Sequence, residues 1–267
     1  MPARRRLDAE MVRRGLAASR ERAREEIALG HVLVGGAPAD KPTRLVAAGD
    51  AVVVSGPGPR FVGRGGEKLA AALDRFAVDV TDRRVLDAGA STGGFTDCVL
   101  QRGAARVVAV DVGYGQLHQR LRDDPRVDVR ERTNVRGLRA ADIDPPVDVV
   151  VADLSFISLR TVLDALVAVA RPGADLVLLV KPQFEAGRRE VSKGRGVIRD
   201  PAVRAATLLG VGAALEERQA AIMGAMVSPL RGADGNVEFL VHAVTAGGPA
   251  LTGPGVDLAA VAGETGH

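Results

Sequence analysis

The chain has 267 residues, of which 46% are hydrophobic and 26% charged, and its formal net charge is +3. This composition fits one large or two modest globular domains. The single cysteine, Cys98, excludes an internal disulfide and a cysteine-rich zinc site, and the absence of Trp excludes a broad aromatic platform for single-stranded nucleic acid.

No stretch predicts a signal peptide or a membrane span. The basic residues of 1–6 are not followed by an apolar segment, and the longest strongly apolar run, 176–180, is far shorter than the roughly 20 residues that cross a bilayer. We therefore expect a monomeric cytoplasmic protein that does not contact a membrane.

Residues 4–60 predict a small α+β unit. A helical apolar pattern ends at Gly15, a second helix is expected from Arg20 to about Leu29, and short β-like runs follow at 31–34 and 51–54. The unit carries eleven basic against seven acidic residues, which favours contact with a polyanion.

The motifs of this unit are Arg6-Leu7-Asp8, Gly15-Leu16-Ala17, Ser19-Arg20, Gly30-His31-Val32 and Val34-Gly35-Gly36. They resemble the RNA-binding domain shared by a small-subunit ribosomal protein, pseudouridine synthases and tyrosyl-tRNA synthetases. Such a domain holds structured RNA through phosphates without reading its sequence. The arginines that would supply the charge are Arg4, Arg5, Arg6, Arg13, Arg14, Arg20 and Arg24. The alternative is a solvated arginine face on a helical hairpin.

The Gly/Pro-rich stretch 55–59 separates this unit from the rest. A helix is then predicted from about residue 64 to Phe76, with Lys68 in its first turn. A cation there is poorly placed against the helix dipole, which hints at a function, although a solvated lysine is the ordinary explanation.

A glycine-rich turn follows the first strand of the larger domain. The strand ends in Asp87, and the spacing D-x-G-x-S-x-G-G fits neither the dinucleotide fingerprint nor the phosphate loop. It resembles motif I of class I S-adenosylmethionine-dependent methyltransferases; the bland alternative is an ordinary strand-to-helix turn. The resemblance implies that the cofactor is bound by Asp87, Gly89, Ala90, Ser91, Thr92, Gly93, Gly94 and Phe95.

Beyond residue 84 the chain alternates between apolar runs and helical periodicity, which predicts a parallel sheet covered on both faces. Strands are expected at 84–88, 106–110, 127–131, 147–152 and 174–180, and helices near 94–102, 115–122, 158–170 and 201–218. Two last strands, 220–228 and 236–244, are expected as an antiparallel pair at one edge. The segment 186–200 is expected to be a mobile basic loop.

Asp111 ends the second strand about twenty residues beyond the glycine turn, where an acid binds a ribose diol in nucleotide-binding sheets. Asn134, past the third strand, could bind an adenine edge, although Asn is common in any loop. Asp153 ends the fourth strand, and Lys181 ends the fifth, all-apolar strand, where an unpaired lysine is unusual.

Lys68, Asp153, Lys181 and Glu238 together resemble the tetrad of ribose 2′-O-methyltransferases. A ribose hydroxyl is a poor nucleophile that needs a base or a positive field. We expect Lys181 to act as the base or to steer the hydroxyl and Lys68 to supply a second positive centre. The two acids would orient both ammonium groups. Surface ion pairs are the alternative for each residue alone.

The RNA-binding motifs, the glycine-rich turn that follows Asp87, the acid Asp111 and the four residues of the tetrad together resemble the TlyA family. This family is also described as haemolysin-like. The resemblance implies S-adenosyl-L-methionine as cofactor and methylation of cytidine 2′-hydroxyls in 16S, and often 23S, rRNA within ribosomal subunits. In actinobacterial members it also implies capreomycin sensitivity. Those members carry Trp in the interdomain linker where this chain has Phe61. The alternatives are a membrane-active haemolysin and an RNA-binding protein with an inactive methyltransferase fold.

This resemblance predicts an α/β protein with a small α+β RNA-binding domain and a Rossmann-like methyltransferase domain on a mainly parallel seven-stranded sheet. The expected bounds are 1–59 for the RNA-binding domain, 60–63 for the linker, 64–245 for the methyltransferase domain and 246–267 for a flexible tail.

Overall fold

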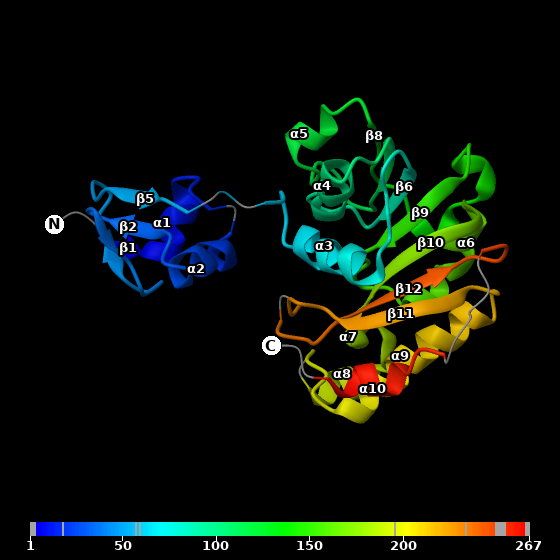
Figure 1. Cartoon of the computed structure of the whole chain (residues 1–267). Helices are drawn as coiled ribbons and strands as arrows, with labels where there is room; N and C mark the ends of the chain where they lie inside the picture. Colours follow the sequence, from blue (N-terminus) through cyan, green and yellow to red (C-terminus); the bar gives the residue numbers. More distant parts are fainter. Residues whose placement is uncertain are drawn as a thin grey trace. The chain divides into compact units, whose positions relative to one another are not determined.

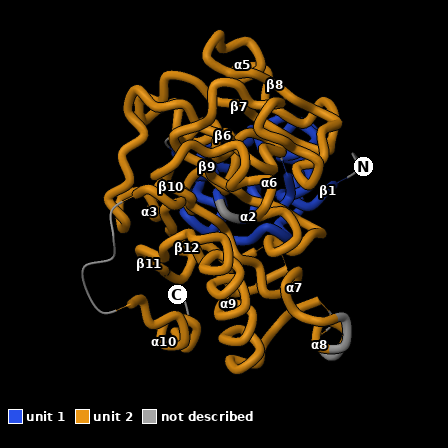
Figure 2. Tube along the Cα trace, turned by 90° about the vertical axis from the view of Figure 1, so that its right-hand side faces the viewer, with its two compact units in different colours: residues 1–60 blue, residues 61–267 orange. Residues whose placement is uncertain are grey.

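The computed structural model describes residues 4–17, 19–56, 58, 60–194, 196–232, 234–248 and 255–264. The chain divides into two compact units, Met1–Arg60 and Phe61–His267 (Figure 2). Each unit buries its own set of apolar side chains.

In the first unit two helices cover two small sheets (Figure 1). The helices are α1 (Leu7–Arg13) and α2 (Arg20–Ala28). The strands are β1 (Arg5–Arg6), β2 (Val32–Val34), β3 (Ala37–Pro38), β4 (Leu45–Val46) and β5 (Val52–Val54), with β1 paired to β4 and the order β3-β2-β5 in the second sheet. Leu7, Met11 and Ile27 fill the core at the helical spacing seen in the sequence.

The second unit is built on a seven-stranded sheet in the order β11-β12-β10-β9-β6-β7-β8. Its strands are β6 (Arg84–Ala88), β7 (Arg106–Val110), β8 (Val127–Arg130), β9 (Val147–Ala152), β10 (Ala170–Val180), β11 (Ala221–Val227) and β12 (Phe239–Val244). The five strands from β10 to β8 are parallel, and β12 runs antiparallel to both β10 and β11. The mainly parallel sheet with an antiparallel edge is confirmed.

Helices cover both faces of this sheet, and the strand residues alternate between the two cores. Leu86, Val150 and Leu178 belong to the core that includes helices α6, α9 and α10, whereas Val85 and Val149 belong to the core of α3 and α4. The bounds are α3 (Gly65–Phe76), α4 (Gly94–Gln101), α5 (Gln119–Arg122), α6 (Leu163–Ala168), α7 (Pro182–Glu185), α8 (Arg188–Lys193), α9 (Pro201–Glu216) and α10 (Leu258–Gly263). Three short 3₁₀ turns, at Val135–Gly137, Ala140–Asp142 and Leu159–Thr161, complete the fold. Burial on both faces explains why the central strands read as continuous apolar runs.

Two predicted irregular segments contain helices. The flexible tail expected over 246–267 is wrong for Leu258–Gly263, which form α10 because Leu258 and Ala262, one turn apart, are both buried beside α9. The loop expected over 186–200 is wrong for Arg188–Lys193, which form α8 between two glycines. Residues 249–254 and 265–267 of the tail and Arg195 of the loop lie outside the described residues.

Two predicted helices are shorter than expected. The one near 115–122 is reduced to α5, because Gly115 has a positive φ of +70° that interrupts a helix. The one near 158–170 is divided into a 3₁₀ turn and α6, and Ala170 already begins β10.

The predicted linker over 60–63 extends too far. Phe61 is 3% exposed and packs so closely on α3 that a Cβ at Gly66 would lie 2.3 Å from its ring. The backbone N–H of Val62 donates to the buried carboxylate of Asp97 at 2.8 Å. Both residues therefore belong to the second unit.

Within the described ranges, no helix combines the length and apolarity that a membrane crossing requires.

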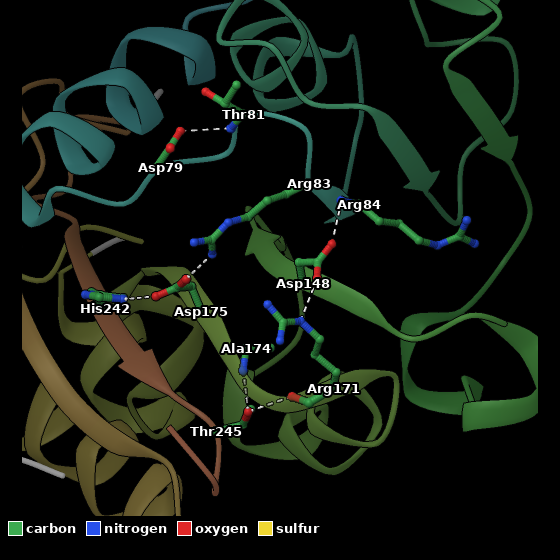
Figure 3. Close-up of polar contacts among 10 residues, drawn as sticks. All are labelled: Asp79, Thr81, Arg83, Arg84, Asp148, Arg171, Ala174, Asp175, His242 and Thr245. Carbon is green, nitrogen blue, oxygen red and sulfur yellow. Dashed lines mark hydrogen bonds and ion pairs between the residues drawn. The ribbon is translucent and has the colours of Figure 1, made fainter. Parts of the chain in front are cut away.

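A polar network ties the sheet together away from its carboxyl edge (Figure 3). Asp175 of β10 accepts hydrogen bonds from Arg83 at 2.7 Å and pairs with His242 of β12 at 2.8 Å. Asp148 of β9 accepts from the backbone N–H of Arg84 and from the Arg171 guanidinium, at 2.8 and 2.5 Å. Burial opposes ionisation of Asp175, but His242 and Arg83 outweigh it and lower the pKa of that carboxyl.

Replacing Asp175 by Asn should destabilise the second unit by about 1–3 kcal/mol at pH 7, because two donors lose a charged acceptor. A lowered carboxyl pKa stabilises the fold above the unfolded-state pKa, and this contribution is lost as the pH falls through the folded-state value. The difference between D175N and the native chain in urea unfolding should therefore shrink in acid. The exposed turn residue Asp79, which accepts from the Thr81 N–H, supplies the control D79N. Equal stability of D175N and D79N at pH 7 would contradict the analysis.

Candidate active site at the carboxyl ends of the parallel strands

The glycine turn after β6 lies in direct contact with the end of β9. Gly89 has a φ of +89°, and a Cβ there would lie 2.5 Å from the backbone oxygen of Asp153. Gly93 has a φ of +98°, and a Cβ there would lie 2.2 Å from Leu121. Both positions require glycine, because a side chain would be strained by the φ and would also collide with a neighbour. The turn is therefore held against β9 and opens at the carboxyl edge of the sheet.

Two adjoining cavities open at this edge. The larger, of about 540 Å³, is lined by residues that follow β6, β7 and β9 and by Asn134. The smaller, of about 200 Å³, is lined by the glycine turn, Gly65 of α3, Ser155, Asp153 and Lys181. Gly89, Ser91, Asp153 and Ser155 line both cavities. Their combined size suits a ligand as large as a nucleoside with an extended side chain.

Asp111 presents a fixed carboxylate to the larger cavity. Its Oδ2 accepts from the backbone N–H of Ser91 at 2.8 Å, and its Oδ1 accepts from that of Gly113 at 2.7 Å. Each carboxylate oxygen retains a lone pair, so the group can still accept from two neighbouring hydroxyls of a ribose. Asn134 is exposed beside it, and its Oδ1 accepts from the Arg136 N–H while its amide N–H groups remain available as donors.

Most of the expected cofactor residues line these cavities. They are Gly89, Ala90, Ser91, Thr92, Gly94, Phe95, Asp111, Asn134 and Asp153. Asp87 and Gly93, both expected at the cofactor, line neither cavity. Asp87 is fully buried below the turn, and Gly93 packs on Leu117 and Leu121, so both support the turn from behind.

Asp87 is an isolated buried carboxyl group. Its Oδ2 accepts from the Thr96 hydroxyl at 2.6 Å, and among the described residues its Oδ1 has no hydrogen-bond partner. Burial raises the pKa of Asp87 to about 7 against the opposing Thr96 hydrogen bond, with smaller contributions from the negative charges of Asp153 and Asp111.

The four residues of the expected tetrad form two ion pairs. Lys68 Nζ lies 2.5 Å from Glu238 Oε2, and both side chains are buried. Lys181 Nζ lies 2.5 Å from Asp153 Oδ1 and 2.9 Å from the Ser155 hydroxyl. Lys181 and Asp153 line the smaller cavity, whereas Lys68 and Glu238 line neither.

Strand register brings the two pairs together. At this edge Val180, the last residue of β10, pairs with Phe239, the first residue of β12. Lys181 follows the first and Glu238 precedes the second, so they occupy neighbouring positions on adjacent strands. Gly65, one turn before Lys68, would carry a Cβ 3.5 Å from Asp153 Oδ2. Side chains from α3, β9, β10 and β12 thus converge on one edge of the sheet.

Sequence reasoning missed two features of this edge. Ser155 belongs to the segment 152–156 that ends the fourth strand but was assigned no role, and its hydroxyl accepts a hydrogen bond from Lys181. Phe156 is 92% exposed and has a φ of +65°, and its ring lies 5.3 Å from that of Phe184. An aromatic residue just after a strand end was the only signal for it in the sequence.

In the first unit two buried acids organise the arginines. Asp8, which is fully buried, pairs with Arg6, Arg20 and Arg24 at 3.0, 3.0 and 3.2 Å. Glu10 pairs with Arg13 and Arg14 at 2.6 and 2.8 Å. Hydrogen bonds from Arg6, and also from Arg20 and Arg24, hold the pKa of Asp8 well below its usual range, and those from Arg13 and Arg14 lower the pKa of Glu10 to about 2.

These contacts divide the expected RNA-binding arginines. Arg6, Arg13, Arg20 and Arg24 keep 40–53% of their side chains exposed around the acids, and Arg4 is exposed. Arg14 is 19% exposed and also donates to the backbone oxygens of Ala47, Ala48 and Asp50. Its guanidinium thus contributes to the structure of the unit, and its expected RNA contact stays a prediction.

Comparison with known proteins agrees with this geometry. The family model described as FtsJ-like methyltransferase matches residues 61–245, and the S4 domain model matches residues 5–52. The 16S/23S rRNA (cytidine-2′-O)-methyltransferase TlyA of Mycobacterium tuberculosis is 52% identical over 258 residues, which cover 96% of each chain. Hemolysin A of Brachyspira hyodysenteriae is 37% identical over 89% of this chain and 98% of that protein. A solved structure from Streptococcus thermophilus that carries a hemolysin name is 38% identical with a TM-score of 0.76, over 98% of this chain and 95% of that chain.

Replacing Asp87 by Asn should flatten the dependence of stability on pH. A folded-state pKa of about 7 means that the native protein holds a proton which the unfolded chain releases near pH 4, so stability falls as the pH rises from about 4 to 7. Each unit of pKa difference corresponds to about 1.4 kcal/mol. Urea unfolding at pH 5 and pH 8 should show a larger loss for the native chain than for D87N. Parallel pH profiles would contradict the buried-acid interpretation.

Replacing Asp8 by Asn should lower the free energy of unfolding of the first unit by roughly 1–3 kcal/mol, because three arginines lose their common charged acceptor. Hydrogen exchange of the α1 and α2 amides in the full chain measures this locally, with the exposed acid Asp40 giving the control D40N. Since Asp8 and Glu10 both have lowered pKa values, native protection should be complete above about pH 4 and decline toward pH 2. Unchanged exchange in D8N would refute the role of this acid.

Proposed function

The chain belongs to the FtsJ-like methyltransferases and, within them, to the TlyA family, and from this premise we propose that it methylates the 2′-hydroxyl of cytidine in ribosomal RNA. As a member of this family it is a methyltransferase that uses S-adenosyl-L-methionine. The proposed substrates are 16S and 23S rRNA within ribosomal subunits, the RNA molecules in the name of the Mycobacterium tuberculosis relative. With ribosomal subunits as substrates, the protein would act in the cytoplasm.

The observation that carries the proposal is the Lys181–Asp153 pair at the wall of the smaller cavity. Its neighbours fit the cofactor: the backbone N–H groups of the glycine turn suit the amino-acid end, Asp111 suits the ribose hydroxyls, and Asn134 suits the adenine edge. When bound, the cofactor supplies an electrophilic methyl group. A hydroxyl reaching the smaller cavity would meet the Lys181 ammonium.

Of the two roles considered for Lys181, steering the hydroxyl fits the contacts better than general base. An ammonium held 2.5 Å from a carboxylate has protons to donate and no lone pair with which to accept one. We propose that Lys181 donates a hydrogen bond to the ribose oxygen and stabilises the negative charge that develops there as the hydroxyl loses its proton to water and bonds to the methyl carbon, while Asp153 and Ser155 fix the direction of the ammonium group. The buried Lys68–Glu238 pair would hold α3 and the start of β12 in position around it.

The first unit supports an RNA substrate. Four exposed arginines held by the buried acids Asp8 and Glu10 form a fixed cationic face suited to backbone phosphates. Phe156, exposed beside the larger cavity, offers an aromatic face on which a base could stack. The hemolysin names of two relatives supply a second candidate, membrane lysis, which an erythrocyte assay on the same preparations would test.

The proposal is tested by transfer of labelled methyl groups from S-adenosyl-L-methionine to purified small and large ribosomal subunits. Lys181→Ala should lower the rate constant for transfer by about 10²–10³-fold, because one charged donor at the reacting oxygen is lost. Calorimetric affinity for the cofactor and affinity for the subunits should both stay near native values.

The matched variant Lys181→Arg separates the two roles of the lysine. Arginine keeps the positive donor but cannot act as a base, so retained activity in K181R beside its loss in K181A supports steering. Equal inactivity of both variants supports a base. Label mapped to a base in place of ribose, or full activity in K181A, would overturn the proposed chemistry.

A further inference from the structure

A third cavity, of about 420 Å³, lies beside the start of α9 and shares no lining residue with the two cavities of the candidate active site. Its charged lining residues are Arg199, Arg204, Arg231 and Asp234. Three arginines and one aspartate thus line the cavity, and Arg199, Arg231 and Asp234 are all exposed. The walls between them are aliphatic and contain no aromatic ring, so a phosphate fits this cavity better than a nucleobase.

Arg204 carries the strongest signal. Its side chain is buried, with 5% of the residue exposed, and among the described residues its Nε has no hydrogen-bond partner. Its Nη2 donates only to the backbone oxygen of Arg199, at a long 3.4 Å. The nearby carboxylate of Asp200 accepts from the Ala202 N–H as the N-cap of α9, and in the part of the chain that the structure describes no ion pair joins it to Arg204.

A buried guanidinium without a carboxylate is unfavourable unless an anion accompanies it. Arg204 lines this cavity together with two further arginines, and its Nε, which is itself buried, has no hydrogen-bond partner among the described residues. Guanidinium groups bind phosphate oxygens with two parallel hydrogen bonds, and three around one cavity suit a single tetrahedral anion.

The walls of this cavity are tied to the active-site residues. Asn236 is 1% exposed; its Oδ1 accepts from the Ile198 N–H and its Nδ2 donates to Gly196 O, both at 2.9 Å. Arg64, just before α3, donates to the backbone oxygen of Arg231 at 3.0 Å. Two residues after Asn236 stands Glu238, which pairs with Lys68 of α3. An anion in the cavity would therefore be fixed relative to the Lys68–Glu238 pair.

We propose that this arginine cavity binds a backbone phosphate of the RNA strand that carries the methylated nucleotide. The proposal rests on the proposed function for the identity of the strand. It gives the methyltransferase unit a contact of its own with the RNA, separate from the arginines of the first unit. Because a phosphate carries no base identity, this contact orients the strand without reading its sequence.

The first test uses inorganic phosphate and does not depend on methyl transfer. Thermal unfolding of the full chain is followed in phosphate and in chloride at equal ionic strength, for the native chain, R199A, R204M and the control R106A. Arg106 is exposed at the start of β7, at the opposite edge of the sheet. Phosphate should raise the Tm of the native chain and of R106A more than that of R199A and R204M. Equal shifts in all four would overturn the proposal.

The second test measures RNA affinity as a function of salt. Loss of one phosphate contact should reduce the slope of log K against log salt by about 1 in R199A and R204M but not in R106A. Should R204M fail to fold, R199A decides, since its side chain is exposed.

The two tests keep the proposals apart. If the native chain binds phosphate through these arginines but transfers no methyl group to RNA, the phosphate site is supported and the proposed function is contradicted. If the native chain methylates RNA but R199A and R204M behave like R106A in both tests, the proposed function is supported and the phosphate site is contradicted.

Discussion

The contact between Gly89 and the end of β9 is the constraint on which the site depends. A Cβ at Gly89 would lie 2.5 Å from the backbone oxygen of Asp153, so glycine alone lets the turn lie against that strand. The same turn receives Asp111, whose carboxylate accepts from the Ser91 N–H. Three parallel strands therefore bring their carboxyl ends to one turn, and both cavities are bounded by it. Without this approach the acids after β7 and β9 would not line the same cavity.

Buried charges recur in this molecule, and their partners differ according to what each must do. Asp8 and Glu10 are surrounded by arginines and fix a cationic surface. Lys68 and Glu238 neutralise each other and join α3 to β12. Asp87 is fully buried, accepts a hydrogen bond from Thr96 and lies beside no cation among the described residues, so burial raises its pKa. Arg204 is the cationic counterpart of Asp87, with one long hydrogen bond to a backbone oxygen. Paired groups hold structure, while groups left with unused donors or acceptors are where ligands or protons can act.

The sequence predicted the sheet well because the central strands are largely apolar and are followed by a charged residue or by the glycine turn. It predicted Asp111, Asp153 and Lys181 at the carboxyl edge for the same reason. It could not predict that Asp87 lies below the turn, since burial at a strand end depends on α4 packing over it. Nor could it separate Arg14 from the other arginines, because its acceptors are backbone oxygens more than thirty residues away. Helix α10 was missed because Leu258 and Ala262 are a weak pattern until α9 is beside them.

The direction of β12 has a consequence for the order in which the molecule is completed. Because β12 runs antiparallel, its first residues lie at the edge where the parallel strands end, and this places Glu238 beside Lys181. It is also an inner strand, hydrogen-bonded to β10 on one side and β11 on the other. A chain synthesised only as far as β11 would hold the glycine turn, Asp111 and Lys181, yet it would leave β10 with an unpaired edge and Lys68 without its acid. The candidate site is thus completed by the last strand that the structure describes, so a nascent chain has its glycine turn well before it has its complete set of charges.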